Sequence, residues 1–236
     1  EQDPDEWWSA LCASCRRAIQ ESGIAPSLIK GLSVDTTCCT VMFSGDDMVP
    51  MRPAIMWMDM RAADQAKFMA ASGHDALKYN GYGPVSAECL PAKVLWVKQN
   101  EPEIYNHATR VYECTDWIMY KLTGRDTASL NCASCRWYYN SREGGYPKSF
   151  YNTIGLEDLI EKPPEVLPMG ECAGQLRADS AAEMGLVEGI PVGEGGADAF
   201  VGVIGLNAVD NGKMALITGS SHLHVALIDR EMHSKG

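Results

Sequence analysis

The stretch Ile190-Pro191-Val192-Gly193-Glu194-Gly195-Gly196-Ala197-Asp198 says most about the fold of this chain. Its first three residues predict a short strand, which opens into a glycine-rich turn that ends on an aspartate. Glycines let a backbone approach a ligand closely. A carboxylate at the carboxyl end of a strand points into the crevice where α/β sheets bind their ligands. The stretch therefore favours an α/β fold with Asp198 at a ligand site.

Two interpretations of Asp198 are open. In a phosphotransferase, such a carboxylate accepts the hydroxyl proton while the acceptor attacks the phosphoryl group. Aspartate is also a favoured helix cap, and Asp198 could simply cap a helix that begins at Ala199. On the local pattern alone, the cap is the simpler interpretation.

Strand-like and helix-like segments alternate along the rest of the chain. Apolar runs bounded by turn residues predict strands, and amphipathic runs closed by glycine or proline predict helices. The predicted strands cover residues 28–34, 40–43, 54–59, 109–113, 213–218 and 222–228, and the predicted helices cover residues 4–22, 61–71, 91–99, 115–122 and 178–184. This alternation is typical of α/β proteins.

A second glycine-containing turn joins the last two predicted strands. It reads Thr218-Gly219-Ser220-Ser221. Small residues in such a turn expose backbone N–H groups and hydroxyls that can hold phosphate oxygens. Most turns of this composition are only turns, so this signal is weak by itself.

Composition and charge exclude several classes of function. The 236 residues carry a formal net charge of -11, and no basic stripe could neutralise a phosphate backbone, which argues against nucleic acid and anionic membranes as partners. No apolar run approaches the roughly 18 residues of a membrane span, so a cytoplasmic location is expected. In this acidic chain, a nucleotide would need Mg²⁺ and local backbone donors.

The nine cysteines include two Cys-x-x-Cys pairs, Cys12 with Cys15 and Cys132 with Cys135. Such pairs raise the hypothesis of a structural zinc module. The first pair lies inside a predicted helix, and about 120 residues separate the two pairs, so their spacing gives no support. Reduced, buried thiols and no metal site are the expected outcome.

Four stretches, in this order and spacing, resemble the FGGY carbohydrate kinases. They are Gly31-Leu-Ser-Val-Asp-Thr-Thr-Cys-Cys-Thr40, Trp57-Met-Asp-Met-Arg-Ala62, Leu122-Thr-Gly124 and Gly195-Gly-Ala-Asp198. Pro84-Val-Ser-Ala-Glu88, Lys93-Val-Leu-Trp96 and Cys135-Arg-Trp137 are most similar to the ribulokinase branch. The resemblance covers nearly the whole chain and implies a pentulose or related polyol as the sugar.

The resemblance also implies an actin-like, ribonuclease-H-like kinase fold with two domains that close over a cleft. Residues 1–208 would form the sugar-binding N-terminal domain without its first strands, and residues 209–236 would begin the nucleotide-binding C-terminal domain. The family's Asp-Gly-Thr phosphate hairpin has no counterpart here, and the chain stops at Gly236. We therefore expect an internal fragment, incomplete at both ends and without kinase turnover when isolated.

Site residues carry over from the family motifs one by one. Asp198 matches the catalytic base. The turn Gly219, Ser220 and Ser221 matches the Gly-Thr-Ser phosphate turn, with serine in place of threonine. Contacts to the sugar are implied for Thr37, Cys38, Trp57, Asp59, Arg61, Arg136 and Asp198.

Plainer roles stay open for some of these residues. Trp57 could be a core residue, Asp59 and Arg61 could form a local ion pair at a helix start, and Arg136 could be a surface cation over Trp137 or Tyr138. The expected activity is ATP-dependent phosphorylation of a small sugar with Mg²⁺, in a protein that could be a homodimer. The alternative is a non-catalytic sugar-binding relative with the same fold.

Overall fold

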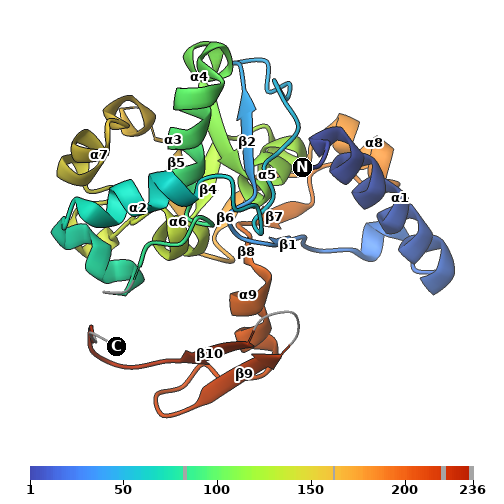
Figure 1. Cartoon of the computed structure of the whole chain (residues 1–236). Coiled ribbons are helices and arrows are strands. Elements are labelled where there is room, and N and C mark those ends of the chain that lie inside the picture. The colour runs from blue at the N-terminus through green and yellow to red at the C-terminus, as the bar shows by residue number, and fades with distance from the viewer. Residues whose placement is uncertain (82–83, 162, 219–221, 234–236) are drawn as a thin grey trace.

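The computed structural model describes residues 1–81, 84–161, 163–218 and 222–233. Helices and strands alternate through these ranges, as the sequence predicts (Figure 1). The helices are α1 (Pro4–Ser22), α2 (Ala63–Ala71), α3 (Leu90–Asn100), α4 (Pro102–His107), α5 (Cys114–Thr123), α6 (Leu130–Arg136), α7 (Lys148–Ile154), α8 (Ala178–Met184) and α9 (Asp198–Gly205). The strands are β1 (Asp35–Thr36), β2 (Val41–Ser44), β3 (Arg110–Glu113), β4 (Thr127–Ser129), β5 (Glu165–Leu167), β6 (Cys172–Gln175), β7 (Pro191–Gly193), β8 (Gly196–Ala197), β9 (Met214–Thr218) and β10 (His222–Ala226).

The strands are short and form pairs of both orientations. β1 pairs with β8 and β4 with β5 in parallel, whereas β2 pairs with β3, β6 with β7 and β9 with β10 antiparallel. In the β1–β8 pair, Asp35 lies opposite Gly196 and Thr36 opposite Ala197. Because parallel strands end at the same edge, the residues that follow β1 and β8 come out side by side.

Two hydrophobic cores support this arrangement. One is built around α2, α3 and α7, and its fully buried residues include Leu90, Phe150 and Tyr151. The other is built around α1, α5 and α8, with Trp117 at its centre. Helix α1 begins at Pro4 after the cap Asp3, whose Oδ1 accepts from the Asp5 amide, and Gly23 ends it in the left-handed conformation that suits glycine.

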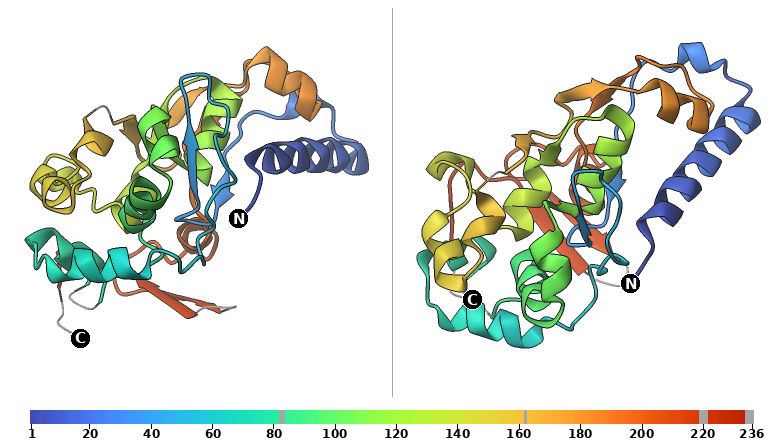
Figure 2. Two further views of the ribbon diagram at one scale, coloured as in Figure 1. Left: turned by 45° about the horizontal axis from the view of Figure 1, so that its top comes forward. Right: turned by 90° about the horizontal axis from the view of Figure 1, so that it is seen from above.

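Helix α9 connects this body to the β9–β10 hairpin. The helix extends from β8 and the hairpin lies beyond it, below the body in the view of Figure 1. Val203, Ala208 and Ala215 form a small separate core where α9 meets the hairpin. The left view of Figure 2 also shows the hairpin below the body.

The glycines before Asp198 are needed for close packing within the body. A Cβ on Gly195 would lie 2.5 Å from the Val34 carbonyl oxygen and 2.8 Å from Cγ2 of Thr115. A Cβ on Gly196 would lie 2.3 Å from Sδ of Met169. The sequence pattern predicts close approach of a ligand at these glycines, whereas the atoms nearest to their Cβ positions belong to the protein itself.

Two predicted strands are wrong in extent. Residues 28–34 contain only a single bridge, Leu32 to Val192, because Pro26 starts a 3₁₀ turn and the paired strand begins later, at Asp35. Residues 54–59 hold isolated bridges at Ala54 and Ile55 instead of a strand. Within the described ranges, none of the helices combines the length and the apolar character needed to cross a membrane.

Candidate active site

A cavity of about 620 Å³ lies between the body and the α9–hairpin unit. The body contributes the segment after β1, the start of the 57–62 stretch, and the end of α6, while α9 and the hairpin form the facing wall. Five of the predicted sugar-site residues line it, namely Thr37, Cys38, Trp57, Arg136 and Asp198. These residues are up to 161 positions apart in the chain.

Asp198 is the first residue of α9 and is exposed to solvent in the cavity wall. Its Oδ1 accepts a hydrogen bond of 2.6 Å from the Ala199 amide. Asp198 therefore both contacts the backbone at the start of the helix and lines the cavity. The strand before it is held from the body: the Ala197 amide donates to Oδ1 of Asn131 and the Ser129 hydroxyl donates to the Gly195 carbonyl. The carboxylate therefore stands on a fixed backbone next to Thr37.

The segment after β1 is strained and held at both ends. Cys39 has φ of 71°, a left-handed conformation that is uncommon for a side chain other than glycine. Its amide donates to Oε2 of Glu113 at 2.6 Å, and Glu113 Oε1 accepts from the Trp137 indole at 3.0 Å. Glu113 is fully buried, and this burial raises its pKa to about 8.

Lys93 holds the carbonyl side of the same segment. This side chain is completely buried in α3, and Nζ donates to the carbonyls of Cys39 at 2.7 Å, Met56 at 2.7 Å and Trp57 at 3.0 Å. Burial lowers the pKa of Lys93. One ammonium group thus joins the Cys38-bearing and Trp57-bearing walls of the cavity.

Arg136 ends α6 and points into the cavity toward Glu88. Its Nη2 lies 3.7 Å from Oε2 of Glu88, and the two side chains remain 34% and 31% exposed. Both line the cavity. A half-exposed arginine keeps several N–H donors available for a ligand with neighbouring oxygens.

Asp59 and Arg61 do not line this cavity. Arg61 donates from Nε and Nη2 to the two carboxylate oxygens of Asp59, and from Nη1 to Glu1 at 2.7 Å. The guanidinium also lies 4.9 Å from the ring centre of Trp96. The bond from Arg61 lowers the pKa of Asp59 to about 2. This is the geometry of an ion pair at the start of α2.

The predicted phosphate turn, Gly219, Ser220 and Ser221, lies outside the described residues. Its neighbours Thr218 and His222 line the same cavity at the hairpin end. Of the Cys-x-x-Cys pairs, Cys12 and Cys15 lie in α1 against α8, whereas Cys132 and Cys135 lie in α6, in another part of the body (Figure 1).

Sequence reasoning assigned no role to Lys93 or Glu113, although both shape the cavity wall. A signal for Lys93 was present, since it is the one charged residue among the apolar positions 90–97. Glu113 similarly follows the apolar pair Val111-Tyr112 and lies directly before helix α5. A charged residue at a position patterned for burial needs buried partners. Here these are backbone carbonyls for Lys93, and the Cys39 amide and the Trp137 indole for Glu113.

Solved structures of sugar kinases share the fold of this chain. It matches the structure of gluconate kinase from Lactobacillus acidophilus with a TM-score of 0.86 and 19% identity, over 98% of this chain and 46% of that chain. The ligand-bound xylulose kinase from the same organism matches with a TM-score of 0.85 and 19% identity, over 98% and 46%. The α/β, actin-like kinase fold predicted from the sequence is confirmed.

The chain belongs to the FGGY family of carbohydrate kinases, whose N-terminal domain matches residues 1–205. It is 34% identical to an FGGY carbohydrate kinase domain-containing protein of Danio rerio, over 96% of this chain and 46% of that protein. It is 30% identical to a ribulokinase of Anoxybacillus flavithermus, over 100% and 45%. The chain thus spans about half the length of the curated relatives it matches.

Proposed function

We propose that this chain forms the sugar-binding part of an ATP-dependent kinase that phosphorylates a pentulose such as ribulose, or a related polyol. The observation that carries the proposal is the cavity where Asp198, at the end of β8, meets Thr37 and Cys38, after β1, with Arg136 in the same wall. Membership of the FGGY family and the relatives named ribulokinase support the substrate class.

In this proposal Asp198 is the general base. A hydroxyl oxygen of the sugar forms a bond to the terminal phosphorus of ATP, the bond from that phosphorus to the ADP oxygen breaks, and the hydroxyl proton passes to the Asp198 carboxylate. Exposure of the carboxylate at the start of α9, on a backbone held by Asn131 and Ser129, supports this role. Such proton transfer contributes roughly 10² to 10⁴ to a rate.

Arg136, Thr37, Cys38 and Trp57 would hold the sugar. The Arg136 fork can bridge two oxygens of an open-chain ketose, and a cavity of about 620 Å³ is ample for five carbons. Asp59 and Arg61 would not contact the sugar directly, because they lie outside the cavity and their charges are paired with each other and with Glu1.

We assign the sugar-binding domain to residues 1–208 and the start of the nucleotide-binding domain to residues 209–236. The match of the family's N-terminal domain to residues 1–205 supports a boundary near this point. ATP would enter as its Mg²⁺ complex, with Gly219, Ser220 and Ser221 at the phosphates. A cytoplasmic setting suits the nine free cysteines.

The test is to measure phosphoryl transfer from ATP to the sugar in a protein as long as the curated relatives, and to compare the wild type with the Asp198→Asn variant. We expect kcat to fall at least 10²-fold while the KM for the sugar stays within about threefold, because asparagine keeps the shape but cannot accept the proton. Asp64→Asn, an exposed change on α2, is the matched control and should leave kcat unchanged.

Wild-type kcat in Asp198→Asn would remove this residue from the mechanism. Sugar binding by the wild-type protein, measured by calorimetry and without any ADP formation, would instead support the non-catalytic relative. Neither binding nor turnover across a panel of pentuloses and pentitols would end the substrate assignment.

A further inference from the structure

Thiols gather in one wall of the cavity. Cys38 and Cys39 follow β1, and Cys132 and Cys135 lie one turn apart on α6. The Sγ atoms of Cys38 and Cys39 are 3.6 Å apart, and Cys135 lines the same cavity. The proposed sugar chemistry needs only a contact from Cys38 and does not explain the others.

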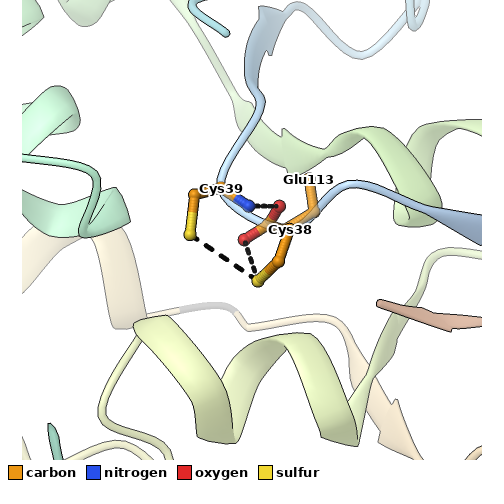
Figure 3. A group of neighbouring side chains, drawn as sticks. All are labelled: Cys38, Cys39 and Glu113. Carbon is orange, nitrogen blue, oxygen red and sulfur yellow. Dashed lines mark hydrogen bonds between the residues drawn. The ribbon is translucent and has the colours of Figure 1, made fainter. Parts of the chain in front are cut away.

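A buried carboxylate completes the cluster. One Sγ from each of Cys38 and Cys39 and one oxygen of Glu113 all lie within 4.8 Å of one another (Figure 3). Cys38 Sγ is 3.9 Å from Glu113 Oε1. Two sulfurs bound at ~2.3 Å to one tetrahedral cation would be roughly 3.8 Å apart, close to the spacing already present.

We propose that Cys38, Cys39 and Glu113 form a binding site for a thiophilic divalent cation such as Zn²⁺, with a water molecule from the cavity as the fourth ligand. Thiolates and a carboxylate in tetrahedral spacing select this class of ion over Mg²⁺ or Ca²⁺, which take oxygen ligands only. This site departs from the expectation of no metal, and it is not the zinc module of the two Cys-x-x-Cys pairs considered from the sequence.

The surroundings favour such an ion. Lys93 donates to the carbonyl of Cys39, and Arg136 lines the same cavity as Cys38 and Cys39, so two cations offset the charge of an anionic ligand set. Trp137 and the Cys39 amide orient the Glu113 carboxylate and leave lone pairs on both of its oxygens. Cys38, Cys39 and Cys135 line the cavity, which gives the ion a path in from solvent.

Co²⁺ titration of the purified, phosphine-reduced chain tests the site, because tetrahedral thiolate ligation of Co²⁺ gives intense visible bands and a sulfur-to-metal charge-transfer band. We expect one equivalent of Co²⁺ with these bands, displaced by one equivalent of Zn²⁺. The double variant Cys38→Ser, Cys39→Ser should lose the charge-transfer band, and Glu113→Gln should weaken Co²⁺ binding at least tenfold. Far-ultraviolet circular dichroism and the thermal midpoint without metal check the folding of each variant.

Cys15→Ser and Cys172→Ser are the matched controls, since Cys15 lies in α1 and Cys172 is exposed on β6. Both should bind Co²⁺ as the wild-type chain does. If the double variant does not fold, the single Cys38→Ser change at this half-exposed position should still weaken binding at least tenfold. A wild-type chain without the charge-transfer band, a Cys38→Ser variant with wild-type affinity, or loss of binding in either control would overturn the proposal. None of these outcomes depends on the sugar.

Discussion

Gly195→Ala should destabilise the fold strongly, because the added methyl group meets backbone. Its Cβ would lie 2.5 Å from the Val34 carbonyl oxygen, 2.8 Å from Cγ2 of Thr115 and 3.0 Å from Cγ2 of Val34. The carbonyl cannot rotate away as a flexible side chain can, since it belongs to the segment that leads into β1. Relief requires β1 and β8 to separate by about half an ångström, an overpacking strain that costs about 2–3 kcal/mol.

Urea unfolding followed by tryptophan fluorescence measures this cost, and the thermal midpoint should fall by roughly 5–10 °C for a chain of this size. Gly202→Ala is the matched control: nothing lies within 4 Å of its Cβ position and it is inside α9, so alanine should stabilise by about 0.5–1 kcal/mol. A Gly195→Ala free energy of unfolding within about 0.5 kcal/mol of wild type would refute the close-packing explanation of this glycine.

Three further outcomes follow from the contacts described above. Lys93→Met should lower the free energy of unfolding in urea by about 2–4 kcal/mol, because three buried carbonyls lose a charged donor, whereas the exposed Lys67→Met should change it by less than about 0.5 kcal/mol. In a kinase as long as the relatives, Arg136→Ala should raise the sugar KM about tenfold and leave the ATP KM alone, and an unchanged sugar KM would return Arg136 to a surface role. The pKa of Asp59 is lowered to about 2, so its ionised form stabilises the fold above the ordinary pKa near 3.8, and this stability is lost as the pH falls toward 2. Arg61→Ala should therefore flatten the stability curve between pH 4 and 2, as acid unfolding measures.

The sequence predicts most of the elements where local signals agree. Helix α8 has the predicted bounds, and Gly124 ends α5 in the left-handed conformation as expected. The strand predicted for residues 28–34 was wrong because an apolar pattern does not show where a partner strand begins. The partner of β1 is β8, more than 150 residues away in the chain. Strand pairing is decided by such tertiary contacts more than by intrinsic preference.

The site residues likewise fall into those that the sequence predicted and those that it did not. Motif resemblance singled out Asp198, Thr37, Cys38 and Arg136, and the fold brings them to one cavity. The roles of Lys93 and Glu113 could not be predicted, because their partners include backbone groups of Cys39 and Trp57 whose positions depend on the folded chain. A pattern of residue types records which side chains are present but not which carbonyls converge on them.

The two ends of α9 contribute differently to the cavity: one end positions Asp198, and the other positions the hairpin wall. Asp198 stands at the end of the helix that is anchored to the body through β8, Asn131 and Ser129, while the opposite end of the helix carries the hairpin wall. A rotation of the hairpin about the first turn of α9 would therefore widen or narrow the cavity without moving the Asp198 backbone relative to Thr37. The position of the proposed base is thus set by the body, whereas the width of the cavity is set by the hairpin.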